Sequence, residues 1–82
     1  MAQERSELLA IVALIKRDAR AASHLTPEIG ELMASDDPRI WMRAVLAFAI
    51  AVANDKLVKA TDRRGAEQLV AVLKPYLDAQ AN

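Results

Sequence analysis

The sequence has no cysteine and a single histidine, so it contains no disulfide framework, no thiolate nucleophile and no Cys/His zinc site. With two glycines, three prolines and three aromatic residues among 82, it falls outside the disordered and repetitive classes, and a β-sandwich is nearly excluded. Eleven basic and eleven acidic residues cancel, which disfavours a nucleic-acid protein that works by bulk positive charge.

Long hydrophobic runs are also absent. The longest uncharged apolar run, residues 44–53, falls well short of the roughly 20 residues that a membrane-spanning helix needs. The first residues are polar and of mixed charge, and the apolar run after them ends in Lys16-Arg17 without a cleavage site, so we identify no signal peptide. The sequence predicts a cytoplasmic chain that does not insert into a membrane.

The chain is rich in alanine, with seventeen residues, and in leucine, glutamate, lysine and arginine. These residues favour α-helices, and a chain of this length has room for one small domain, residues 1–82. Apolar residues at a spacing of three and four predict its helices at residues 4–23, 27–34, 38–54 and 62–80.

Two helix boundaries are less well determined by the sequence. The third helix either ends at Asn54, with that residue in a left-handed cap, or runs on to residue 60, because no breaker follows. Residues 47–53 also alternate as a strand would, but alanine is a poor strand former and the flanks are helical. Pro75 should bend or end the fourth helix near Leu73, because proline removes one helical hydrogen bond.

Capping residues mark the expected helix starts. Thr26 and Asp37 each precede a proline at the first helical position, and Thr61 or Asp62 is the expected cap of the fourth helix. Capping explains the aspartates before the third helix better than a cation site does, since no calcium-loop pattern accompanies them. Gly30 lies inside the second helix, where close backbone packing would explain its presence.

The predicted helices carry more apolar surface than so small a bundle can cover. On the third helix, two faces are formed by Trp41, Val45, Phe48 and Val52 and by Met42, Leu46, Ile50 and Leu57. The first helix is apolar nearly all round over residues 8–15. We therefore expect an all-α bundle of three longer helices and one short helix, completed as a homodimer or higher oligomer. The expected oligomer interface consists of Leu9, Leu14, Leu46, Ile50 and Leu57.

Two segments have the composition of a partner-binding surface. Around Trp41, methionine and arginine gather as they do at interface hot spots, although plain core packing also explains a tryptophan there. A basic group at the end of the first helix would orient a partner, or would simply complement the helix dipole. The predicted partner-binding residues are Arg39, Trp41, Met42, Arg43, Lys16, Arg17 and Arg20.

Motifs for catalysis are missing. His24 stands alone between two predicted helices and is best explained as a structural or exposed histidine. The serines lie in no nucleophile motif and no glycine-rich phosphate loop is present, so we expect no enzyme, no catalytic residue, no cofactor and no metal.

The expected function is therefore protein binding without catalysis. The chain would be a small adaptor, inhibitor or regulatory subunit that buries an apolar helical face against a larger protein. Small helical proteins of this kind are often accessory factors of phages, plasmids or secretion systems. The alternative is a nucleic-acid-binding regulator that uses Lys56, Lys59, Arg63 and Arg64, although interleaved aspartates weaken this interpretation. On a continuous helix the first three of these residues would share one sector.

Overall fold

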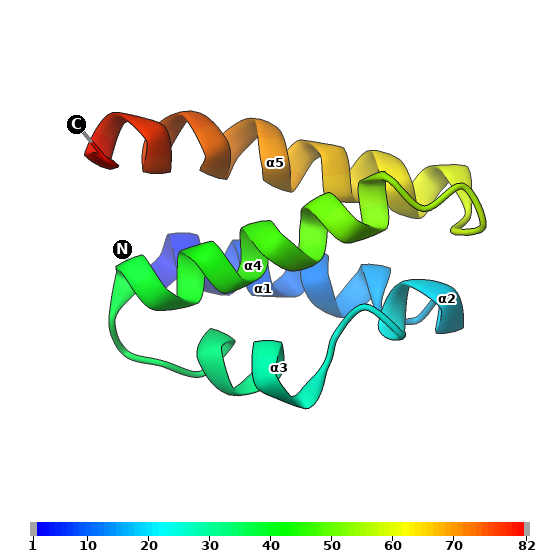
Figure 1. Ribbon diagram of the computed structural model, residues 1–82, viewed down its shortest axis with the longest axis horizontal. Helices are drawn as coiled ribbons and strands as arrows, with labels where there is room; N and C mark the ends of the chain where they lie inside the picture. Colours follow the sequence, from blue (N-terminus) through cyan, green and yellow to red (C-terminus); the bar gives the residue numbers. More distant parts are fainter. Residues whose placement is uncertain (1, 82) are drawn as a thin grey trace.

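The computed structural model describes the backbone of residues 2–81 and the side chains of residues 4–80. Over this range the protein is all-helical, as predicted, with helices α1 (Ala2–Ile15), α2 (Ala19–Ala22), α3 (Pro27–Met33), α4 (Pro38–Ala53) and α5 (Ala60–Ala81). Figure 1 shows α4 lying across α1, with α5 along one side and α3 along the other. The helices α1 and α4 run in one direction and α5 runs back.

Helix α4 is the centre of the packing. It contacts α5 and α3, while α5 also contacts α1. The first of its two predicted apolar faces, which comprises Trp41, Val45, Phe48 and Val52, is buried, so this prediction is confirmed. The strand alternative for residues 47–53 is wrong, because that segment continues α4.

The first predicted helix is not continuous. Helix α1 ends at Ile15, and α2 begins at Ala19 after a turn. Asp18 caps α2, since its carboxylate accepts hydrogen bonds from the amides of Arg20 and Ala21 at 2.9 and 3.4 Å. The break changes the helical phase, and as a result Ala21 is buried while Ala19 is exposed. The bundle therefore has two short helices where one was predicted.

The caps of the next two helices agree with the prediction. The Thr26 hydroxyl accepts from the Ile29 amide at 3.2 Å, and the Asp37 carboxylate accepts from the Arg39 amide at 2.9 Å. Helix α4 ends at Ala53, so the continuation to residue 60 is wrong. Asn54 caps it in a right-handed conformation, with φ −92° and ψ −2°, and not in the left-handed one.

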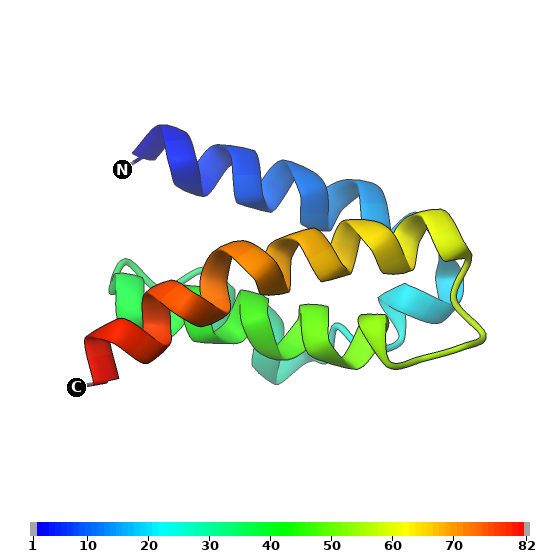
Figure 2. The same cartoon turned by 90° about the horizontal axis from the view of Figure 1, so that it is seen from above.

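Helix α5 starts earlier than predicted. Because its first residue is Ala60, Thr61 and Asp62 lie within its first turn and do not cap it. The helix passes through Pro75 without ending. Figure 2 shows its axis changing direction in the C-terminal part, which agrees with the predicted bend.

The two glycines have opposite surroundings. A Cβ added at Gly30 would meet no atom within 4 Å, so the expectation of close backbone packing at this residue is wrong. A Cβ added at Gly65 would lie 3.4 Å from Cδ1 and Cγ1 of Ile15. Close approach in this fold therefore occurs between α5 and α1.

Candidate protein-binding site

A pocket opens at the end of the bundle where α1 and α4 begin. Its volume is about 270 Å³, and it is lined by Glu4, Arg5, Leu8, Asp36, Pro38, Trp41 and Met42. This volume lies below the range of roughly 300–1,000 Å³ of most small-molecule sites. A pocket of this size can take a single large side chain of another protein.

The sequence builds this pocket from the start of α4. Capping by Asp37 and the fixed backbone of Pro38 begin the helix here, which places Trp41 on the inner side of its first turn. Trp41 is only 4% exposed, so it forms the floor of the pocket and belongs to the core. Of the two interpretations of Trp41, core packing is confirmed, and a protruding anchor is wrong for this chain on its own.

Arg5 holds the wall of the pocket in place. Its guanidinium carbon lies 4.9 Å from the centroid of the Trp41 ring, within the range of a cation–π interaction. Its Nη2 also donates a 2.8 Å hydrogen bond to the carbonyl oxygen of Met33 at the end of α3. One side chain thus joins α1, α3 and α4.

The charged residues that line the pocket are two carboxylates and one guanidinium, a net charge of −1. Glu4 and Asp36 are exposed lining residues, whereas the positive charge of Arg5 is engaged with the Trp41 ring and the Met33 carbonyl. The remaining lining, from Leu8, Pro38 and Met42, is apolar. Such a pocket suits an apolar side chain that has cationic neighbours.

The structure divides the predicted segment around Trp41 between two sides of α4. Met42 lines the pocket, whereas Arg39 and Arg43 line a second hollow with Asp37 and Ile40. The Nε of Arg39 lies 3.8 Å from Oδ1 of Asp37, an exposed ion pair. The two arginines are exposed as predicted but do not share the pocket with Met42.

The predicted basic group at the end of the first helix is also divided. Because that helix breaks after Ile15, Lys16 and Arg17 lie in the turn and Arg20 lies on α2. The expectation that they share one side of a single helix is wrong. Arg20 is also occupied, since its Nε donates to Oδ2 of Asp55 at 2.5 Å.

Asp55 is the centre of a polar network that the sequence did not reveal. Besides Arg20, its Oδ2 lies 2.7 Å from Nε2 of His24, and its Oδ1 accepts from the Leu57 amide at 3.0 Å. The side chain is 8% exposed. The hydrogen bond from His24, then the Leu57 amide and Arg20, lower the pKa of Asp55 to about 2 against the opposing effect of desolvation. His24 therefore has a structural role, as expected.

Asp18 makes a second link across the same end of the bundle. Its Oδ2 accepts from the Lys59 amide at 3.1 Å, while its Oδ1 caps α2. The hydrogen bond from the Lys59 amide is the main cause of the lowered pKa of Asp18. The turn after α1 and the loop between α4 and α5 are thus joined by two carboxylates.

The basic segment proposed for nucleic-acid binding does not form one helical sector. Lys56 and Lys59 lie in the loop, whereas Arg63 and Arg64 lie on α5. Arg63 is half-buried, and its Nε is buried without a hydrogen-bond partner among the described residues. The continuous helix on which that interpretation depended is absent.

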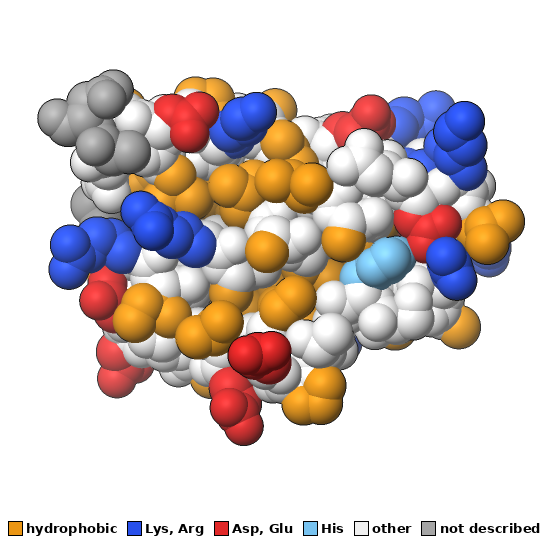
Figure 3. Space-filling view, viewed as in Figure 1, with side chains coloured by type: hydrophobic (Ala, Val, Ile, Leu, Met, Phe, Trp, Pro, Cys, Tyr) orange, Lys and Arg blue, Asp and Glu red, His pale blue; other side chains and the backbone are white. Residues whose placement is uncertain are grey.

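The residues of the expected oligomer interface are unequally exposed. Leu9 and Leu46 are half-buried against the core, whereas Leu14, Ile50 and Leu57 are 60%, 39% and 73% exposed. The exposed three belong to α1, α4 and the loop. In Figure 3 the apolar side chains of the visible face lie in several groups separated by polar atoms. Three of the five residues are therefore exposed, and their shared interface stays a prediction.

Comparison with protein family models, curated proteins and solved structures finds no match for this chain. Within the described part of the chain, no group of three or more His, Asp or Glu side chains is placed to hold a metal ion. None of the described helices combines the length and the apolar character that crossing a bilayer requires.

Proposed function

We propose that the protein is a non-catalytic protein-binding module, a small adaptor, inhibitor or regulatory subunit. It acts by taking an apolar side chain of another protein into the pocket between α1 and α4. The observation that carries this proposal is the pocket itself, which has an apolar lining, two exposed carboxylates at its rim and a volume of about 270 Å³.

The rigidity of the pocket supports this role. Trp41 is fixed in the core, and Arg5 is fixed by the Trp41 ring and by the Met33 carbonyl. A site whose walls are already ordered loses little side-chain entropy when a partner binds. The apolar lining supplies affinity, and Glu4 and Asp36 select partners with cations beside the inserted side chain.

Selection from a displayed library of random peptides tests the proposal. Peptides that bind the purified protein should share one large apolar residue with basic neighbours and should change the fluorescence of Trp41, the single tryptophan. Met42→Lys, which places a positive charge in a pocket that receives an apolar side chain with basic neighbours, should weaken their binding about tenfold or more.

Ile40→Lys is the matched control, because Ile40 lies on the same turn of α4 but lines the other hollow. It should leave peptide affinity within about twofold of wild type. Selected peptides that bind both variants equally, or a failure to select any peptide, would show that the pocket is not a protein-binding site.

A further inference from the structure

Leu57 protrudes from the end of the bundle opposite the pocket. It is 73% exposed, the largest value among the exposed large apolar residues of the described chain. The loop on both sides of it is fixed, since its own amide is bonded to Asp55 and the Lys59 amide is bonded to Asp18. Val58, the next residue, is buried. Leu57 is thus held outward by an ordered loop.

The charges around Leu57 are mainly positive. Residues 16–24 and 54–64 form this end of the bundle and contain seven basic and three acidic residues, a net charge of +4. Two of these carboxylates, Asp18 and Asp55, are directed into the structure. The end with the pocket, residues 4–8 and 34–43, contains three basic and four acidic residues, a net charge of −1. The zero net charge therefore hides a polarised molecule.

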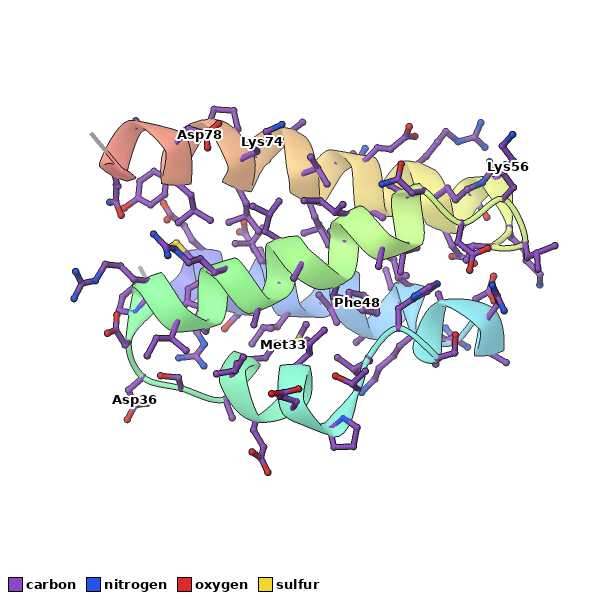
Figure 4. All side chains as sticks on the ribbon, viewed as in Figure 1. Met33, Asp36, Phe48, Lys56, Lys74 and Asp78 are labelled. Carbon is purple, nitrogen blue, oxygen red and sulfur yellow. The ribbon has the colours of Figure 1, made fainter. Side chains whose placement is uncertain are left out.

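The two ends are complementary in shape and charge. One end presents an exposed leucine between the exposed Lys56 and Lys59, and the other presents an apolar pocket between the exposed Glu4 and Asp36. Figure 4 shows Lys56 and Asp36 at opposite ends of the bundle. Arg39 and Arg43 line the second hollow at the start of α4 and not the pocket, whose own three charged residues sum to −1.

From this complementarity we infer that the pocket receives Leu57 of a second copy of the chain, with Lys56 and Lys59 facing Glu4 and Asp36. The inference rests on the protein-binding role proposed above for the same pocket, and it names the partner. An end-to-end contact between these two different surfaces is head-to-tail, so it adds copies into an open chain, or into a ring if the rotation closes.

The size of the contact predicts a weak association. The molecule measures 34 × 23 × 21 Å, and its long axis follows the helices. Only one end of a small domain takes part, with backbone extents of about 23 by 21 Å, so the contact belongs with small, transient interfaces. Assembly should therefore be reversible, require a high concentration and weaken when salt screens the lysine–carboxylate contacts.

Sedimentation velocity of the purified chain tests this inference. At low salt, the average mass of the wild type should rise above 9.0 kDa as the concentration approaches about 1 mM, without stopping at a dimer. Two variants each disable one surface. The tip variant, Lys56→Ser/Leu57→Ser, removes the protruding leucine and the lysine before it, which we call the tip. The pocket variant, Glu4→Lys/Asp36→Lys, reverses the two charges at the pocket. Each alone should associate about tenfold more weakly than wild type.

Mixing the two variants gives the decisive result. The intact tip of the pocket variant can enter the intact pocket of the tip variant, but no further copy can be added, so the mixture should form a 1:1 dimer. The control Val72→Ser/Lys74→Ser also removes one exposed apolar residue and one lysine, but from α5, and should associate like wild type.

Other occupants give different results, and each would overturn the inference. A wild type that stays at 9.0 kDa while the selected peptides still bind would assign the pocket to a foreign protein and leave the proposed function intact. Association that neither variant weakens would point to a symmetric interface elsewhere. A monomer whose tip binds duplex DNA or anionic vesicles would assign Leu57 and its lysines to such a surface.

Discussion

The two ends of the bundle are held together by different means. At one end, Asp18 and Asp55 accept hydrogen bonds from backbone and side-chain donors and join the turn after α1 to the loop before α5. At the other end, the guanidinium of Arg5 lies over the Trp41 ring beside an open pocket. The first end is closed by hydrogen bonds, and the second depends on apolar packing.

This difference shows how a small domain can combine stability with an open binding site. Hydrogen bonds at the closed end satisfy charged groups locally and require little apolar area. The large side chains of α4 pack in the rest of the core. The open end keeps an apolar pocket that nothing in the described chain fills. We therefore expect mutations at the two ends to differ in size and in pH dependence.

The largest effect is expected at the open end. Trp41→Ala removes a buried ring and also the partner of the Arg5 guanidinium. A cavity of this kind costs about 3–5 kcal/mol, a large share of the roughly 5–15 kcal/mol of a small domain. Urea unfolding followed by circular dichroism measures the loss. Arg39→Ala, at an exposed position on the same turn, should change the free energy of unfolding by less than about 0.5 kcal/mol.

A loss below about 1 kcal/mol for Trp41→Ala would mean that the tryptophan is not part of the core. In that case the emission maximum of the wild-type tryptophan should also lie in the red, as it does for an exposed ring. A blue maximum together with a large loss confirms the floor of the pocket. The two measurements are independent, because emission is read from the folded protein alone.

The next effect is expected at the closed end. Asp55→Asn removes the charge that faces Arg20 and His24 but keeps an oxygen that can accept from the Leu57 amide. We expect the thermal midpoint at pH 7 to fall by several degrees, less than for Trp41→Ala. Asp36→Asn is the matched control, because the Asp36 side chain is exposed and belongs to the other end.

The closed end should also respond to acid. The pKa of Asp55 is about 2 in the folded state, below its ordinary value of 3.8, so the carboxylate stabilises the fold above about pH 4. This contribution is lost as the pH falls from about 4 to 2. Thermal melts of wild type should show a falling midpoint in this window, and Asp55→Asn should flatten the fall. Parallel curves for the two proteins would contradict the network around Asp55.

The sequence predicted the parts of the fold that depend on periodicity and caps. The buried face of α4 follows from apolar spacing, and the starts of α3 and α4 follow from Thr26 and Asp37 before proline. The break at Asp18 was missed because no proline or glycine marks it. An aspartate inside a predicted helix, able to cap a new one, was the available signal.

Contacts across the bundle could not be predicted in the same way. His24 and Asp55 are 31 positions apart, and nothing in the spacing of either residue indicates that they meet. Arg5 has no signal of its own as the residue that lies over Trp41. Both contacts depend on the direction of loops and on the phase of helices after the break, which tertiary packing determines.

The smallest effects are expected at the two glycines. Gly65 reports how closely α5 approaches α1 at the closed end, and Gly30, on α3, is the reference. Both lie within helices and neither has a positive φ, so alanine should gain helix propensity at each, up to about 1 kcal/mol. At Gly30 the new methyl group meets nothing within 4 Å, so the full gain should appear as a higher urea midpoint.

At Gly65 the same methyl group would touch two carbons of Ile15 at 3.4 Å, the lower limit of ordinary contact. The side chain of Ile15 is buried and has little room to move, so overpacking should offset most of the gain in propensity. Gly65→Ala should therefore leave the midpoint nearly unchanged, and Gly65→Val should lower it. If Gly65→Ala stabilised the protein as much as Gly30→Ala, the added methyl group would meet no resistance from Ile15, and the close approach of α1 and α5 at this end would be contradicted.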